Sequence, residues 1–225
     1  MYHRLRIVVL LSVAIASQFA NAQRDLLPNI LWLSVEDIGP HLGCYGDKAA
    51  NTPNLDAFAK RSLTYDIAWS NYPVCAPART TIITGVYPAA TGSGHMRSQM
   101  PLPDGMKFFP QILRKAGFYC TNNSKTDYNL VPDGKVNGDV WDDSSKTAHY
   151  KNRVEGQPFF AVFNDTRTHE SKIRKKPHDL VTDPATVELP AYHPDRPEIR
   201  RDWGQYYDNI HSMDGWVAKK LQELE

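Results

Sequence analysis

The sequence predicts an α/β layer protein, in which helices cover a sheet that contains buried strands. Residues Asn29–Val35 form a continuous apolar run of strand length, as expected of a central strand buried on both faces. The run ends in Glu36-Asp37 and is followed by Gly39-Pro40, which is typical of a loop at the carboxyl end of a strand. Further along the chain, apolar runs of strand length are interspersed with amphipathic helical patterns, as in other α/β folds.

The other elements follow from periodicity and from Gly and Pro signals. Thr52-Pro53 begins a helix that runs to about Arg61 and carries its apolar residues on one face. Further helices are predicted after Cys75, over Phe108–Ala116 and over Glu198–Glu225, and further strands over Leu63–Trp69, Phe118–Asn122 and Phe159–Asn164. Two polar or proline-rich stretches, Thr126–Gln157 and Lys176–Pro197, are predicted to be irregular.

Composition narrows the class of partner. The formal net charge is +1 and the isoelectric point is about 7.7, so neither nucleic acid nor an acidic surface is an expected partner. A hydrophobic content of 41% is that of an ordinary globular domain with a sizeable core.

The N-terminus predicts export. Arg4 and Arg6 precede the apolar run Ile7–Ala16, and Ala20-Asn21-Ala22 is a small-x-small cleavage site. Residues 1–22 are therefore interpreted as a secretory signal peptide, and the protein as periplasmic or secreted, or lysosomal in a eukaryote. A retained N-terminal membrane anchor is the alternative. No other stretch is apolar enough for a stable membrane span.

Three cysteines are an odd number for an exported protein, which suggests that one of them has another fate. Cys75 opens the run Cys-Ala-Pro-Ala-Arg-Thr-Thr-Ile-Ile-Thr-Gly, which places Pro77 two residues on and Arg79 four residues on. By itself such a cysteine is usually a small buried side chain or half of a disulfide. Cys44 and Cys120 would then remain as a disulfide or as two free thiols.

The Cys75 run resembles the signature of type I sulfatases. The resemblance implies that a maturase oxidises Cys75 to formylglycine, an aldehyde whose hydrate, a geminal diol, attacks the sulfur of a sulfate ester. A serine that accepted the sulfuryl group would leave a stable ester, whereas a sulfated diol can expel sulfate, so Cys75 would be the precursor of the nucleophile. The resemblance also implies an alkaline-phosphatase-like fold with a doubly wound, mostly parallel sheet.

The resemblance extends over Asn29–Glu225, which makes residues 23–225 the N-terminal part of a sulfatase catalytic domain. In the family, a helix like Glu198–Glu225, with its Tyr-Tyr and Met-Asp pairs, leads into a strand whose Asp-His or Asp-Asn pair completes the metal site. We therefore expect a sheet that is incomplete at the C-terminus. One alternative function is that of an inactive truncated fragment that at most binds sulfated glycan.

The acidic pair after the first strand is the candidate metal site. Glu36 and Asp37 lie at the carboxyl end of a strand, where open α/β sheets gather their ligands. The family carries two aspartates here that bind Ca²⁺ together with the hydrated aldehyde derived from Cys75. Glu36 is one methylene longer than the usual aspartate. Carboxylate oxygens suit Ca²⁺, and also Mg²⁺. Without the Cys75 motif, the pair would be interpreted as a solvated acidic turn.

Three further candidates lie within the Cys75 motif or after the predicted strand Phe118–Asn122. Arg79 is one helical turn after Cys75, where its guanidinium could hold the diol by charge-assisted hydrogen bonds. Lys125 corresponds to the family lysine that binds a sulfate oxygen. Asp127 stands where the family has a histidine that takes a proton from the diol, so it is the candidate base.

Two histidines complete the candidate set. His169 follows the strand Phe159–Asn164 and resembles the family histidine that contacts sulfate and protonates the leaving alcohol, a task suited to a pKa near working pH. An exposed loop histidine is the alternative interpretation. His95 is a weaker candidate for the lining of the substrate pocket.

The predicted function is therefore hydrolysis of sulfate esters or N-sulfates of a sulfated carbohydrate. Residues Leu42–Asp47 (Leu-Gly-Cys-Tyr-Gly-Asp) and Val74–Pro77 are most similar to the glycosaminoglycan branch, which includes heparan N-sulfatases and iduronate sulfatases. A phosphodiester or phosphonate monoester hydrolase of the same superfamily, sharing the modified cysteine, is the second alternative.

Overall fold

The computed structural model describes residues 27–131, 139–174 and 179–225. The predicted signal peptide lies outside these residues. The chain divides into two compact units. The described part of the first comprises residues 27–32, 70–131 and 139–163, and that of the second comprises residues 33–69, 164–174 and 179–225. The division falls within two strands, after Trp32 and after Phe163.

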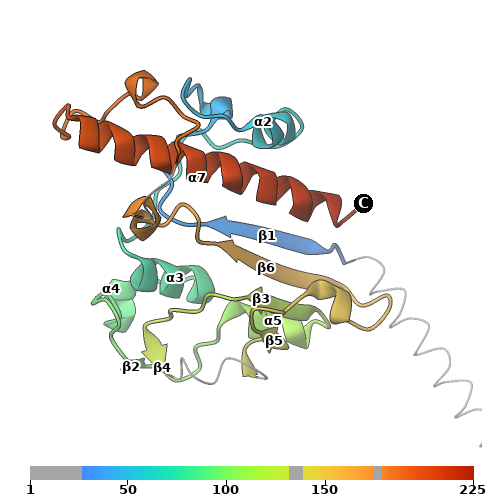
Figure 1. Ribbon diagram of the computed structural model, residues 1–225. Coiled ribbons are helices and arrows are strands. Elements are labelled where there is room, and N and C mark those ends of the chain that lie inside the picture. The colour runs from blue at the N-terminus through green and yellow to red at the C-terminus, as the bar shows by residue number, and fades with distance from the viewer. Residues whose placement is uncertain (1–26, 132–138, 175–178) are drawn as a thin grey trace, which may run out of the picture. The chain divides into compact units, whose positions relative to one another are not determined.

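The main sheet has four strands in the order β1-β6-β3-β5, which are Ile30–Val35, Phe159–Asp165, Tyr119–Asn123 and Asp143–Ser144 (Figure 1). β3 pairs in parallel with β6, from Tyr119 opposite Phe159 to Asn123 opposite Phe163. β3 also pairs in parallel with β5. Every residue of β6 except Asn164 is buried, as expected of a strand with neighbours on both sides.

The first unit adds three helices and a small second sheet. The helices are α3 (Cys75–Thr84), α4 (Pro88–Thr91) and α5 (Phe109–Lys115), and β2 (Met100–Pro101) pairs in parallel with β4 (Leu130–Val131). A short 3₁₀ helix, η3, covers Tyr150–Asn152. The core contains Trp141 and Phe160, whose rings stack with centroids 5.8 Å apart, and Phe108 and Leu130, all of them fully or almost fully buried.

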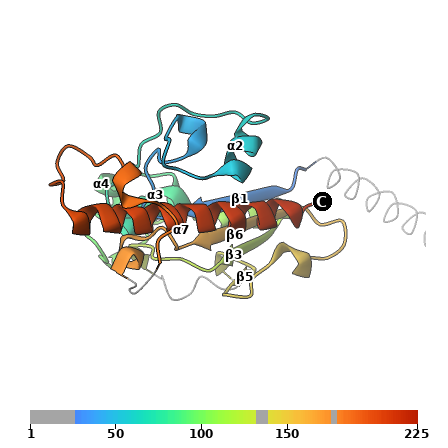
Figure 2. The same cartoon turned by 45° about the horizontal axis from the view of Figure 1, so that its top comes forward.

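The second unit is built around the long helix α7 (Pro197–Gln222), beside which α2 (Pro53–Ala59) lies (Figures 1 and 2). Its other elements are the 3₁₀ helices η1 (Gly43–Tyr45), η4 (Glu170–Arg174) and η5 (Pro184–Thr186). One face of α7 supplies the buried core residues Tyr207, Ile210, Met213 and Val217, which recur at helical spacing.

The fold confirms the prediction of an α/β protein with parallel strands. The predicted helices after Thr52, Cys75, Phe108 and Glu198 all form, as do the strands over Asn29–Val35, Phe118–Asn122 and Phe159–Asn164, within one or two residues at most ends. The strand predicted over Leu63–Trp69 is wrong, because the segment has no strand conformation. The stretch Thr126–Gln157 is not wholly irregular either, since it contributes β4, β5 and η3.

All three cysteines lie in the described parts, and each is a free thiol, so Cys44 and Cys120 form no disulfide with each other. Burial raises the pKa of the Cys120 thiol to about 12, so this buried thiol stays protonated and unreactive. Cys44 is exposed and Cys75 is half-buried. Among the described residues, no helix is both long enough and apolar enough to cross a membrane.

Candidate active site

Cys75 is the first residue of α3. Val74 precedes it in an extended conformation, and Gly85, with φ of 71°, ends the helix. Pro77 lies in the first turn, where a missing N–H costs no helical hydrogen bond. Ala76 and Pro77 are buried, whereas Cys75 remains partly accessible. Because the first turn of a helix presents N–H groups without intrahelical partners, this position favours an anion beside the cysteine.

Arg79, one turn after Cys75, holds the turn that carries Lys125. Its Nε donates a hydrogen bond to the carbonyl oxygen of Thr126 at 2.8 Å, and its Nη2 donates to the carbonyl oxygen of Lys125. Asp127 in the same turn has φ of 53°, a left-handed conformation that aspartate tolerates better than most residues. The structure therefore joins the turn that carries Lys125 and Asp127 to the helix that contains Cys75 and Arg79.

The loop that carries His95 is tied to the same helix through Asn129. The side-chain amide of Asn129 donates to the carbonyl oxygens of Ser93 and His95 at 2.7 and 2.8 Å. The backbone N–H of Asn129 donates to Oγ1 of Thr80 in α3 at 2.8 Å. Because Asn129 is buried, these contacts hold the backbone at His95 in place. The imidazole ring of His95 is exposed.

The second unit brings together the acidic pair and His169. The hydroxyl of Thr168 donates to the carbonyl oxygen of Glu36, and the N–H of Glu170 donates to Oδ2 of Asp37 at 2.9 Å. Nε2 of His169 lies 3.9 Å from the same Asp37 oxygen. Glu36, Asp37 and His169 therefore lie on neighbouring segments of this unit. The backbone of Asp37 has φ of 47°, which is uncommon for a residue other than glycine. The eight predicted residues thus fall into two groups, one in each unit.

The acidic pair suits a hard cation by its chemistry. Glu36 is buried and Asp37 is about one-third exposed, so carboxylate groups are held at the end of β1. In the described parts of the chain, no group of three or more His, Cys, Asp or Glu side chains is arranged to hold a metal ion. Ca²⁺ prefers six to eight oxygen ligands, so Glu36 and Asp37 alone would form only part of such a site. The ligand set Glu36, Asp37 and Cys75 stays a prediction.

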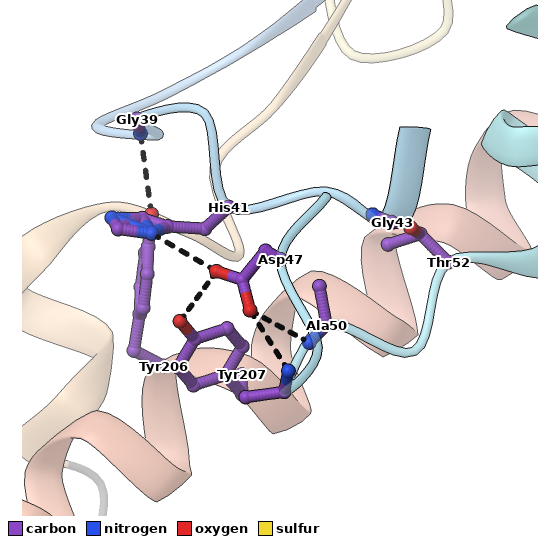
Figure 3. Close-up of polar contacts among 9 residues, drawn as sticks. Gly39, His41, Gly43, Asp47, Ala50, Thr52, Tyr206 and Tyr207 are labelled. Atoms are coloured by element: carbon purple, nitrogen blue, oxygen red, sulfur yellow. Dashed lines mark hydrogen bonds and ion pairs between the residues drawn. The ribbon is translucent and has the colours of Figure 1, made fainter. Parts of the chain in front are cut away.

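The loop that follows the acidic pair is anchored to α7 (Figure 3). The N–H of Gly39 donates to the hydroxyl oxygen of Tyr206 at 3.3 Å. Oδ2 of Asp47 accepts the hydroxyl of Tyr207 at 2.7 Å and lies 3.4 Å from Nδ1 of His41. The His41 ring packs edge-on against the rings of Trp203, Tyr206 and Tyr207. Burial raises the pKa of Tyr206 to about 12, so this phenol stays protonated while the fold is intact.

We expect stability to fall less steeply between pH 7.5 and pH 5 when His41 is replaced by phenylalanine. Burial lowers the pKa of His41 in the folded protein, against the opposing effect of the Asp47 charge. The unfolded chain gains this proton near pH 6.5, so the contribution is complete above about pH 6.5 and is lost as the pH falls through the folded pKa. Urea midpoints at the two pH values measure the difference. His211→Phe, which removes a histidine at an exposed position of α7, is the matched comparison, and an equal effect of the two variants would contradict a specific contribution of His41.

Parallel strands in an α/β sheet, with a cysteine at the first turn of a helix and carboxylates at the end of a strand, agree with the alkaline-phosphatase-like fold. The chain belongs to the sulfatase family, whose sequence model matches residues 28–225. This match confirms the resemblance predicted from the sequence, and it covers almost the same residues.

Individual relatives agree with this assignment. The chain is 36% identical over 247 residues to the ulvan-active sulfatase of Formosa agariphila, a match that covers 88% of this chain and 41% of that protein. It is 36% identical over 115 residues to iduronate 2-sulfatase of Homo sapiens, covering 50% of this chain and 21% of that protein. The chain therefore spans less than half the length of these two sulfatases.

A solved structure shows the same fold. The phosphonate monoester hydrolase SpPMH from Silicibacter pomeroyi superposes with a TM-score of 0.68, covering 88% of this chain and 59% of that chain. The sequence identity is 16%, so this likeness concerns the fold alone.

Proposed function

We propose that the protein is an exported sulfuric ester hydrolase that removes sulfate from a sulfated carbohydrate. The observation that carries the proposal is the position of Cys75 at the first turn of α3, with Arg79 one turn later holding the Lys125 turn. This arrangement places a nucleophile precursor, a helix N-terminus and two cationic residues on connected elements, as the transfer of an anionic group requires. The names of the two sulfatase relatives support the same activity.

The proposed nucleophile is the hydrate of formylglycine, which a formylglycine-generating maturase would produce from Cys75. One hydroxyl of the diol gives up its proton, for which Asp127 is the candidate base, and its oxygen attacks sulfur. The bond between sulfur and the ester oxygen breaks, and His169 gives a proton to the departing alcohol. The carbon–oxygen bond to the sulfate group then breaks while the second hydroxyl loses its proton and the aldehyde re-forms. The departing sulfate takes up this proton and leaves as hydrogen sulfate.

The other site residues neutralise and orient the sulfate. Lys125 and Arg79 would balance its negative charge, and the N–H groups at the start of α3 favour an anion at the same place. Glu36 and Asp37, with the group derived from Cys75, would hold Ca²⁺, or alternatively Mg²⁺, whose charge stabilises the developing charge on the sulfate oxygens. His95 would line the substrate pocket.

A phosphonate monoester or phosphodiester hydrolase is the second candidate, because the SpPMH structure shares the fold. The test is to produce the protein together with a maturase and to compare kcat/KM for an aryl sulfate with kcat/KM for the matching aryl phosphonate and phosphodiester. We expect the sulfate ester to be preferred by at least about tenfold. Release of sulfate from sulfated sugars then identifies the carbohydrate. A preference for the phosphorus substrates would replace the proposed activity with the second candidate.

A further inference from the structure

A fully buried asparagine at the end of β3 holds the turn that carries Lys125. Asn122 is 0% exposed. Its Nδ2 donates to the carbonyl oxygen of Lys125 at 3.1 Å and to Oγ of Ser144 at 2.9 Å. Ser144 belongs to β5 and is the register partner of Asn122 in the sheet. Because an amide nitrogen carries two hydrogens, these two bonds use its donor capacity fully.

The carbonyl oxygen of Lys125 is held by a second side chain as well. Arg79 donates from Nη2 to this oxygen and from Nε to the carbonyl oxygen of Thr126. Asn122 comes from a central region of the sheet, and Arg79 comes from the helix that Cys75 begins. A carbonyl oxygen has two lone pairs, so one donor from each element satisfies it. The backbone at Lys125 is therefore fixed with respect to both elements.

We infer that Asn122 is a positioning residue for Lys125 in the reaction. This inference rests on the proposed role of Lys125 as a sulfate ligand. A lysine ammonium stands on a flexible four-carbon stem, so its reach is set by where the backbone holds its Cα. The turn also includes Asp127 with its positive φ. Asn122 thus fixes the part of the chain from which the ammonium meets the substrate.

The adjacent residue provides a matched control. Asn123 lies in the same strand, and its Nδ2 also donates to two acceptors, the carbonyl oxygens of Lys146 at 2.9 Å and Ala148 at 3.2 Å. These contacts hold a different loop, which carries none of the proposed site residues. Loss of the Asn123 side chain therefore removes an asparagine of the same strand and its two bonds to backbone carbonyl groups, without loosening the Lys125 turn.

The experiment is a double-mutant cycle on the maturase-treated protein, with Asn122→Ala, Lys125→Ala and the double variant. The readouts are kcat and KM for an aryl sulfate, and the inhibition constant of inorganic sulfate. We expect Asn122→Ala to lower kcat/KM by about 10- to 100-fold and to weaken inhibition by sulfate, because small displacements of a positioned group have effects of this size. In the Lys125→Ala background, the same change should alter kcat/KM by less than about threefold.

Asn123→Ala should lower the urea midpoint less than Asn122→Ala does, because Asn123 is only partly buried, and it should leave kcat/KM within about threefold of the parent. Asn122→Ser, which keeps a shorter donor, should show a weaker form of the Asn122→Ala pattern and replaces it if the alanine variant does not fold. If Lys125→Ala retains full turnover, the proposed role of Lys125 is wrong. If Lys125→Ala loses turnover while the Asn122 variants behave like Asn123→Ala, or if the two effects multiply, Asn122 does not act through Lys125.

Discussion

Replacing Cys75 with alanine is expected to lower kcat for a sulfate ester by at least about 10⁴-fold, because loss of a covalent nucleophile removes the reaction route itself. Cys75 is half-buried at the start of α3, and alanine is smaller than cysteine and favours a helix, so the substitution is compatible with the fold. The urea midpoint should therefore stay close to that of the parent. Steady-state turnover of an aryl sulfate measures the loss.

Serine at the same position separates a nucleophile from a merely structural cysteine. Cys75→Ser should accept the sulfuryl group once and then stop, since its sulfate ester has no second hydroxyl from which to eliminate. Intact mass should show a bound sulfuryl group in this variant, and a loss of about 18 Da at Cys75 in the maturase-treated parent, as oxygen replaces sulfur and two hydrogens.

Cys44→Ala is the matched control for these variants, because Cys44 is an exposed free thiol in the second unit. It should leave both turnover and the change in mass unaltered. Full turnover by protein whose Cys75 still reacts as a thiol would contradict the formylglycine mechanism.

The sequence correctly predicted helices and strands whose apolar residues recur at regular spacing. It failed for a segment that has the spacing of a strand but no neighbouring strand to pair with. In Leu63–Trp69 the apolar residues alternate, which is the pattern of a strand, yet Leu63 and Trp69 are 82% and 88% exposed. A strand requires hydrogen bonds to a neighbour, and in the described residues no strand pairs with this segment. Alternation reports which side chains suit a sheet, but it does not say what they pair with.

The candidate site shows a similar limit. The resemblance to sulfatases singled out Cys75, Arg79 and Lys125, and the structure places their segments in contact. The residues that hold them were not predicted. Asn122, in β3, and Thr168, in the turn after β6, are buried polar residues, and a buried polar side chain needs hydrogen-bond partners that the sequence does not name. Their partners, the carbonyl oxygens of Lys125 and Glu36, are backbone atoms, which carry no sequence signal.

Asp214, of the Met213-Asp214 pair, is a buried polar residue that holds the start of another helix. Met213 enters the core of the second unit, and the carboxylate of Asp214, which is 0% exposed, caps the start of α2. It accepts the N–H of Leu55 at 2.7 Å, the N–H of Asn54 at 3.2 Å and the side-chain amide of Asn54 at 2.7 Å. Thr52, the N-cap residue, makes no side-chain cap bond, because its hydroxyl accepts from Gly43 and donates to Asp56. A carboxylate of α7 therefore replaces the local cap of α2.

Asp214→Ala should lower the free energy of unfolding by about 3 kcal/mol, because it leaves three donors without an acceptor and removes a negative charge from a helix N-terminus. Asp214→Asn keeps the shape and one acceptor oxygen, so its loss should be smaller. Urea unfolding monitored by tryptophan fluorescence measures both.

Asp208→Ala is the matched control on the same helix. Asp208 also accepts two backbone N–H groups, those of Val181 at 3.0 Å and Thr182 at 2.9 Å, but at a partly exposed position where water can replace the carboxylate. Its loss should cost only about 1 kcal/mol. Equal losses at the two positions would show that Asp214 contributes as an ordinary surface acceptor, and that α2 is held to α7 by its apolar contacts alone.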